Sequence, residues 1–153
     1  MSDPQASFRT TQPHHIGVVV RDIEKAIEYL EALGFGPFRF DDEHKVFAIE
    51  FKGELHGRPA EWTTKISNAK MGPIELELLE PYAGEQALKE TLDAQGEGLH
   101  HLGWLSSDIR GEIERATAKG AKVWTSSFPE GQPGFCYFEG TDVGNIAIEL
   151  REP

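Results

Sequence analysis

The chain contains the same short sequence twice, and each copy opens with a pair of histidines. His14-His15-Ile16-Gly17 recurs 86 residues later as His100-His101-Leu102-Gly103. The same spacing continues through an aspartate, two isoleucines and a glycine, namely Asp22/Asp108, Ile23/Ile109, Ile27/Ile113 and Gly34/Gly120. Because so many positions keep one spacing, we interpret the likeness as an internal duplication and not as chance similarity between two βα units.

A second pair of matching segments closes the two copies. Ile74–Pro81 (IELELLEP) resembles Ile146–Pro153 (IAIELREP), with an offset of 72 residues. The two offsets differ by 14, so we expect an insertion in the first copy, much of it in the turn-like segment Gly53–Pro59. A duplicated module with His at its start and Glu at its end can bring two His and two Glu together across a pseudo-twofold axis. That arrangement is the outline of a metal site.

Hydrophobic periodicity, helix caps and turn residues give each copy the order β-α-β-β-β, which is an α+β fold. The expected elements are strands at 15–20, at 38–40 or 46–51, at 62–66 and at 74–79, a linking helix at 85–95, strands at 101–105, 122–125, 135–139 and 146–150, and helices that start after Asp22 and Asp108 and stop at Gly34 and Gly120. We divide the chain into a loose arm at 1–12, a βαβββ module at 13–81, a linking helix segment at 82–98 and a second βαβββ module at 99–153, together one compact domain.

Composition and charge argue against several classes of partner. The formal net charge of −11 at pH 7 disfavours nucleic acid and anionic membranes. No apolar run reaches the roughly 20 residues that span a bilayer, and residues 1–12 do not resemble a signal peptide. Cys136 is the single cysteine, which suits a reducing compartment, so we expect a cytoplasmic protein. An open eight-stranded sheet has edges that pairing would cover, so we also expect a homodimer.

Strand geometry selects the candidate ligands. Alternate residues of a strand share a face, so each second histidine, His15 or His101, shares a face with the glycine two residues later, which leaves space for a ligand or a partner chain. Glu77 and Glu149 lie between apolar neighbours, and a buried carboxylate needs a partner. By the same alternation we expect His14 and His100, which point to the opposite face, to be solvated or hydrogen-bonded edge residues. Glu75 shares a face with Glu77, and we expect it to be a solvent-side strand residue.

Two imidazoles and two carboxylates, with two positions left for water or substrate, suit an octahedral divalent ion such as Co, Mn, Ni, Fe or Mg. A tetrahedral structural zinc site usually contains sulfur, and the chain offers one cysteine. Zn stays among the candidate ions for a site that is not structural.

The duplicated module with its His…Glu…His…Glu order resembles the vicinal-oxygen-chelate superfamily, which includes glyoxalase I, extradiol dioxygenases, fosfomycin-resistance proteins and methylmalonyl-CoA epimerase. The linking helix and the segments Glu77–Pro81 and Gly96–His101 are most similar to the epimerase branch. This resemblance implies two βαβββ modules that form a curved, eight-stranded mixed sheet around a metal cleft. It also implies four metal ligands, which are His15, Glu77, His101 and Glu149.

The resemblance further implies a reaction on a small carbonyl compound, with an acyl-CoA as one candidate. The divalent ion would chelate two substrate oxygens and stabilise an enolate while a carboxylate removes a neighbouring proton. Glu149 would be both ligand and base, and Glu61, 16 residues before Glu77, is the nearest candidate for a second base. The leading prediction is a metal-dependent epimerase or isomerase, with methylmalonyl-CoA epimerase as the first candidate.

Three other functions fit the same pattern. A glyoxalase-type lyase, similar to lactoylglutathione lyase, would use the same four ligands. An Fe(II) dioxygenase is less favoured because its usual site has one carboxylate ligand, so Glu77 would be surplus. A non-catalytic drug-binding protein is a fourth candidate. Nine aromatic residues lie in segments expected near the cleft, and if several face it, an apolar or aromatic substrate is favoured over an acyl-CoA: Phe35, Phe38, Phe40, Phe47, Phe51, Trp62, Phe135, Tyr137 and Phe138.

Overall fold

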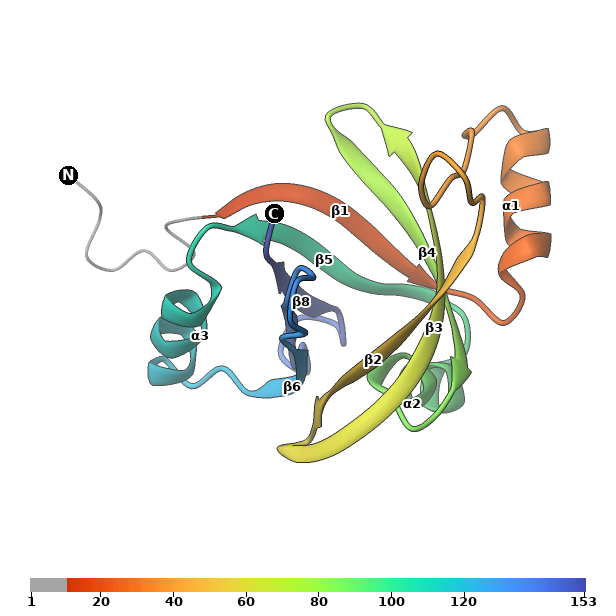
Figure 1. The fold of residues 1–153 in the computed structure, drawn as a ribbon. Helices are drawn as coiled ribbons and strands as arrows, with labels where there is room; N and C mark the ends of the chain where they lie inside the picture. The colour runs from red at the N-terminus through yellow and green to blue at the C-terminus, as the bar shows by residue number, and fades with distance from the viewer. Residues whose placement is uncertain (1–10) are drawn as a thin grey trace.

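The computed structural model describes residues 11–153 and has the α+β fold expected from the sequence (Figure 1). Each half follows the order β-α-β-β-β, and α2 links the halves. Thr11 and Gln12, expected in the arm, belong to the first strand, and the rest of the predicted arm lies outside the described residues. The elements are β1 (Thr11–Val19), α1 (Ile23–Ala32), β2 (Phe47–Leu55), β3 (Arg58–Met71), β4 (Ile74–Ala83), α2 (Ala87–Gln95), β5 (Gly98–Ser106), α3 (Ile109–Ala118), β6 (Val123–Ser127), β7 (Phe135–Phe138) and β8 (Ala147–Arg151).

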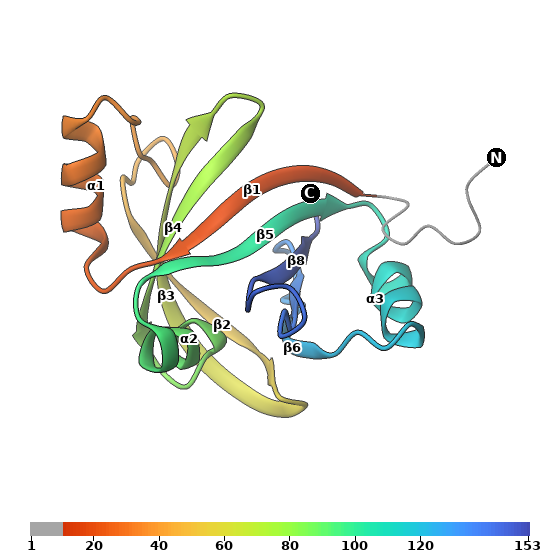
Figure 2. The same cartoon turned by 180° about the vertical axis from the view of Figure 1, so that it is seen from behind.

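The eight strands form one mixed sheet that closes into a barrel in the order β1-β4-β3-β2-β6-β7-β8-β5. β1 and β5, the first strands of the two modules, pair antiparallel, and Figures 1 and 2 show them side by side between the modules. On the opposite side, Glu54 and Leu55 of β2 pair with Ser126 and Thr125 of β6. The curved eight-stranded mixed sheet expected from the sequence is therefore confirmed.

The helices α1 and α3 occupy equivalent places on the outer sides of the two modules (Figures 1 and 2). Each starts at an aspartate cap: the Asp22 carboxylate accepts the backbone N–H of Lys25, and the Asp108 carboxylate accepts that of Gly111. In the part of the chain that the structure describes, no helix is both long enough and apolar enough to cross a membrane.

Each closing strand turns one face to a helix and the other to the interior of the barrel. In β4, Leu78 packs in one core cluster with α1, whereas Glu77 lines the interior cavity. In β8, Leu150 packs in a second cluster with α3, whereas Glu149 lines the cavity. Because burying a leucine stabilises a fold by about 1.5–3 kcal/mol, the leucines fix the register that turns the glutamates inward.

The linking helix α2 closes one end of the barrel. Its Leu88 and Leu92 pack against Val19 and Leu79, which lie in β1 and β4. Leu88 also lines the cavity, so α2 forms part of the cavity floor.

The insertion in the first module is not where the sequence suggested. The turn between β2 and β3 is limited to His56 and Gly57, which both have positive φ, and the strands continue through the rest of Gly53–Pro59. A two-residue turn of this kind matches the twist of a hairpin and needs no extra loop. The extra residues lie in the connection 33–46 between α1 and β2 and in the longer β2–β3 hairpin.

Closure of the sheet bears on the expected homodimer. That expectation rested on open sheet edges, and the eight described strands are joined into a closed barrel. The homodimer stays a prediction, but it can no longer be argued from unpaired strands.

Candidate metal centre and cavity

Four strands each place one side chain at the same buried point. His15 comes from β1, Glu77 from β4, His101 from β5 and Glu149 from β8, and none is more than 5% exposed. The sheet register explains the meeting, because Gly17 of β1 pairs with both Glu77 and His101. The equivalent glycine of β5 pairs with the other two residues. The structure thus brings together all four ligands predicted from the sequence.

The donor atoms of these four residues all lie within 4.8 Å of one another. The Nε2 atoms of His15 and His101 are 3.0 Å apart, and Oε2 of Glu149 lies 2.5 Å from the first and 2.9 Å from the second. Oε1 of Glu77 lies 3.6 and 3.4 Å from the same two nitrogens. Two ligands about 2.1 Å from one ion and at right angles are separated by about 3.0 Å, so this donor set fits a divalent ion.

Electrostatics support the same conclusion. Burial alone would raise the pKa of Glu149, but the adjacent His15 and His101 outweigh it and hold that pKa well below its usual value. Burial would also raise the pKa of Glu77, but His15 and His101 together outweigh it and lower that pKa. Burial would lower the pKa of His101, yet the Glu149 carboxylate raises it to about 9. The carboxylates are therefore ionised, and positive charge between them, from protons or from a metal ion, stabilises the cluster.

Each candidate ligand histidine contacts the histidine that precedes it. In the β1–β5 ladder, His14 and His100 are skipped between paired neighbours, so each is the extra residue of a β-bulge. Nδ1 of His14 lies 2.8 Å from Nδ1 of His15, and the same distance joins His100 to His101. The expectation that His100 is an edge residue is wrong: it is 1% exposed, because a bulge interrupts the strict alternation of faces.

The histidine before each candidate ligand can determine which ring nitrogen of the ligand carries the proton. Burial lowers the pKa of His100 to about 3, so this ring is neutral and its Nδ1 can accept a hydrogen bond. His101 can then carry its proton on Nδ1, donate it to His100 and present Nε2 as a metal ligand. Among the described residues, Nε2 of His100 has no hydrogen-bond partner. The hydrogen bond of the His100 ring is therefore the one between its Nδ1 and Nδ1 of His101.

The structure does not bring Glu61, the predicted second base, to this centre. Its side chain is 73% exposed and pairs with Lys52 at 3.4 Å on the outside of the β2–β3 hairpin. Trp62 and Thr64 of the same strand, β3, line the cavity. Glu61 is an odd number of residues from both, so its side chain lies on the other face of the strand. Strand alternation therefore turns the Glu61 carboxylate away from the site.

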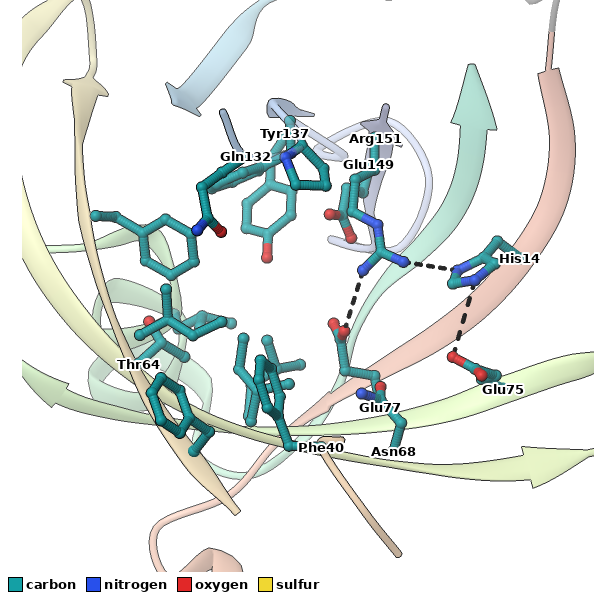
Figure 3. A pocket seen from close by; sticks show the side chains of 18 of the residues that line it. His14, Phe40, Thr64, Asn68, Glu75, Glu77, Gln132, Tyr137, Glu149 and Arg151 are labelled. Carbon is teal, nitrogen blue, oxygen red and sulfur yellow. Dashed lines mark hydrogen bonds and ion pairs between the residues drawn. The ribbon is translucent and has the colours of Figure 1, made fainter. Parts of the chain in front are cut away.

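A cavity of about 1000 Å³ opens beside the four residues. Figure 3 shows the polar side chains of His14, Glu75, Glu77, Glu149 and Arg151 gathered on one side of it. Six of the nine aromatic residues noted in the sequence line the cavity, namely Phe40, Phe47, Phe51, Trp62, Phe135 and Tyr137. Glu75 also lines the cavity and does not simply face solvent, since it lies 3.8 Å from His14.

Arg151 is a cavity residue that the sequence analysis missed. Its Nη1 lies 3.8 Å from Glu77 Oε2, and its Nη2 lies 3.5 Å from Nδ1 of His14, as the dashed lines in Figure 3 show. The signal was available, because Arg151 follows Glu149 by two residues on a strand and must share its face.

Comparison with known proteins agrees with this architecture. Over 143 residues the chain is 23% identical to the uncharacterized protein YqjC of Bacillus subtilis (strain 168), with 91% of the chain and 90% of the relative covered. The hypothetical protein BH1468 of Bacillus halodurans C-125 has a similar structure, with a TM-score of 0.64, 19% identity and coverage of 95% and 96%. Methylmalonyl-CoA epimerase of Mycobacterium tuberculosis matches with a TM-score of 0.61, 22% identity and coverage of 100% and 93%.

A family model also matches most of the chain. The model describes the glyoxalase/bleomycin resistance protein/dioxygenase superfamily, and the match spans residues 14–138, from the first histidine pair to the end of β7. The chain therefore belongs to the glyoxalase/bleomycin resistance protein/dioxygenase superfamily.

Proposed function

We propose that this protein is a metal-dependent isomerase that moves a proton on the carbon next to a substrate carbonyl. The supporting observation is the buried set of His15, Glu77, His101 and Glu149, with donor atoms within 4.8 Å of one another. A divalent ion held there would act as a Lewis acid and make the neighbouring C–H bond more acidic. Glu77 and Glu149 of this set line the cavity, so a substrate bound in the cavity would lie next to an ion held by the four residues.

Glu149 is the proposed base. Its carboxylate lines the cavity and belongs to the candidate ligand set, so it lies within reach of a substrate carbon next to an ion held there. Burial, followed by the charge of Glu149, raises the pKa of Tyr137, so that hydroxyl keeps its proton. Figure 3 shows the Tyr137 hydroxyl directed into the cavity, where it can donate a hydrogen bond to a substrate oxygen. One C–H bond breaks and one new bond to hydrogen forms, so the reaction needs no oxidant.

The distribution of acids favours one base over two. Epimerisation by two bases needs carboxylates on opposite faces of the substrate carbon, and the Glu61 side chain points away. Glu50 is an exposed rim residue in the outward-facing set of β2. The inward residues of β2 and β3 that line the cavity are uncharged: Phe47, Ile49, Phe51, Trp62, Thr64, Ile66 and Asn68. Isomerisation on one face, or the related proton shift of a glyoxalase-type lyase, therefore fits better than methylmalonyl-CoA epimerisation.

The test begins with metal binding. Chelator-treated protein is titrated with Co²⁺ by calorimetry, and the loaded protein is then incubated in D₂O with three compounds. These are a single epimer of methylmalonyl-CoA, the adduct of methylglyoxal with glutathione, and phenylpyruvate. We expect NMR to show deuterium entering the carbon next to the carbonyl of at least one compound, and a loss of about 100-fold or more in Glu149→Gln.

Two results would contradict this proposal. Interconversion of the methylmalonyl-CoA epimers would contradict isomerisation on one face by Glu149 alone and would restore the epimerase prediction. Tight Co²⁺ binding without exchange in any compound would instead favour a non-catalytic binding protein.

A further inference from the structure

The cavity lining includes two chemically different groups of side chains, which we call its polar end and its apolar end. Beside the candidate metal centre, Arg151 places a guanidinium group next to Glu77 and His14. The apolar end consists of Phe51, which stacks on Trp62 with ring centroids 5.6 Å apart, and Phe135, which meets both rings edge-on at 5.4 and 6.5 Å. The two ends adjoin each other, because Phe135 of β7 pairs with Arg151 of β8. A ligand that fills this space has one polar, oxygen-rich end and one apolar end.

The polar end of the cavity is suited to bind an anionic group of a ligand. A divalent ion would neutralise the two carboxylates of Glu77 and Glu149, which leaves the charge of Arg151 uncompensated. The guanidinium makes a 3.8 Å ion pair and a 3.5 Å contact, both longer than a good hydrogen bond. The side chain lines the cavity and is 31% exposed. Arginine binds carboxylates through two parallel N–H donors, so a substrate carboxylate fits this position.

The charge pattern also argues against a coenzyme A thioester. Besides Arg151, the cavity-lining cations of the described chain are Arg39 and Lys70. Arg39 donates to the backbone carbonyls of Asp41 and Asp42, and Lys70 pairs with Glu75 at 3.3 Å. Among the described residues that line the cavity, a ligand with several phosphates would therefore meet no cluster of free cations.

The apolar end is shaped for a flat ring. Trp62 and Phe135 are each less than a tenth exposed, and their packing holds them in fixed orientations. Aromatic rings prefer stacked or edge-to-face neighbours about 4.5–7 Å away, a preference that an alkyl chain lacks. Phe40 and Phe47 form a second stacked pair in the cavity lining, at 5.1 Å.

We propose that the cavity binds a 2-oxo acid that carries an aromatic ring, with its carboxylate at Arg151 and its ring among Phe51, Trp62 and Phe135. The oxo group then lies at the metal centre and the carbon between oxo group and ring lies near Glu149. This inference rests on the proposed function, because it names the substrate class for the same site. A proton shift from that carbon to the oxo oxygen would convert the keto form to the enol form without a change in oxidation state.

The test compares three ligands by calorimetry on the Co²⁺-loaded protein. Phenylpyruvate has ring and carboxylate, pyruvate lacks the ring, and phenylacetone lacks the carboxylate. We expect phenylpyruvate to bind at least about tenfold more tightly than either of the others, because each end of the cavity contributes.

Two variants test which end of the cavity binds the ring of the ligand and which binds its carboxylate. Trp62→Ala should remove most of the preference for phenylpyruvate over pyruvate while pyruvate affinity stays within about twofold. Arg151→Gln should weaken both acids by about tenfold or more and leave phenylacetone unchanged. Co²⁺ affinity is measured in each variant, because Arg151 contacts Glu77 and a change there would alter the metal centre itself.

The outcomes separate this inference from the proposed function. Equal affinity for pyruvate and phenylpyruvate would overturn the aromatic end, and unchanged acid binding in Arg151→Gln would overturn the anion site. If phenylpyruvate does not bind while another compound shows deuterium exchange that depends on Glu149, the substrate class is wrong and the isomerase proposal survives. Failure to bind Co²⁺ would overturn both.

Discussion

Gly17 lies directly opposite His101 in the β1–β5 ladder, and its missing side chain is what leaves room for the His101 imidazole. A Cβ placed on Gly17 would overlap the ring atoms of His101, and a Cβ on Gly103 would overlap the ring of His15 in the same way. The sequence suggested that these glycines leave space for a ligand or partner chain. They instead make space for the histidine of the other module, so each half of the duplication shapes the candidate metal centre.

Substitution of Gly17 by alanine should therefore damage metal binding more than folding. The added methyl group must displace the His101 ring, which we expect to weaken Co²⁺ affinity by about 10–100-fold and to destabilise the fold by about 1–3 kcal/mol. Calorimetric titration and urea unfolding measure the two effects. Gly53→Ala is the matched control, because its Cβ would overlap the backbone of Ser126 far from the centre. That variant should lose stability and keep its metal affinity.

His100 should act through His101 without touching the ion. In His100→Phe a ring of similar shape replaces the imidazole, so packing against Trp124 and Tyr137 is kept while the Nδ1 acceptor is lost. We expect Co²⁺ affinity to fall by about 10–100-fold, the usual cost of losing the group that orients a ligand histidine. His44→Phe, at an exposed position paired with Asp41, is the control. Equal affinity in wild type and His100→Phe would show that the bulge does not orient His101.

The four central residues could be predicted because they follow two simple regularities. The repeat aligned His15 with His101 and Glu77 with Glu149, and strand alternation put each on the inner face. The histidine that precedes each ligand could not be assigned this way, because a β-bulge breaks the alternation and sequence alone did not reveal it. A bulge depends on the register of the partner strand, which is a property of the folded sheet.

For Glu61 and Arg151, strand alternation predicts correctly which side chain faces the cavity, whereas the distance along the sequence from Glu77 does not. Glu61 was chosen for its distance from Glu77, yet it is one residue out of phase with the inward-facing Trp62. Arg151 is in phase with Glu149 and faces the cavity. The location of the insertion could not be read from composition, because the Gly- and Pro-containing segment Gly53–Pro59 is mostly strand.

Glu61→Gln should leave the protein almost unchanged. The Glu61 side chain is 73% exposed and pairs with an 85% exposed Lys52, and surface pairs of this kind contribute about 0–1 kcal/mol. We expect stability within about 0.5 kcal/mol of wild type and any exchange activity within about twofold. A large loss of exchange rate in this variant, with metal affinity intact, would show that Glu61 reaches the substrate after all.

Metal removal should lower the thermal stability of the protein. The four buried donors lie together in the folded chain and are scattered in the unfolded one. An ion bound by them at a concentration 100 times its Kd would therefore stabilise the fold by about 2.7 kcal/mol. For a chain of this size that corresponds to a rise in Tm of about 5–10 °C. Differential scanning calorimetry with and without Co²⁺ measures the rise. It should vanish in Glu77→Gln, and a rise that persists there would place the binding site elsewhere.

The stability of the metal-free protein should fall as pH rises above neutrality. Folding raises the pKa of His101 from 6.5 to about 9, because the Glu149 carboxylate outweighs the opposing effect of burial. The folded chain then holds a proton that the unfolded chain releases, so the contribution of His101 is complete below pH 6.5 and is lost as pH rises through about 9. Urea unfolding of chelator-treated protein at pH 6, 7.5 and 9 measures this trend.

The same proton must leave when a metal ion binds, which gives the trend an internal control. Nε2 of His101 cannot hold both a proton and an ion, so Co²⁺ affinity should increase over the pH range in which the metal-free protein loses stability. With saturating Co²⁺ the loss of stability should be abolished or reversed, and His101→Gln should remove it in the metal-free protein. A metal-free wild type with the same unfolding midpoint at all three pH values would mean that the carboxylates do not hold this proton. Their negative charge would then have to be balanced in another way, with Arg151, 3.8 Å from Glu77, as the nearest cation.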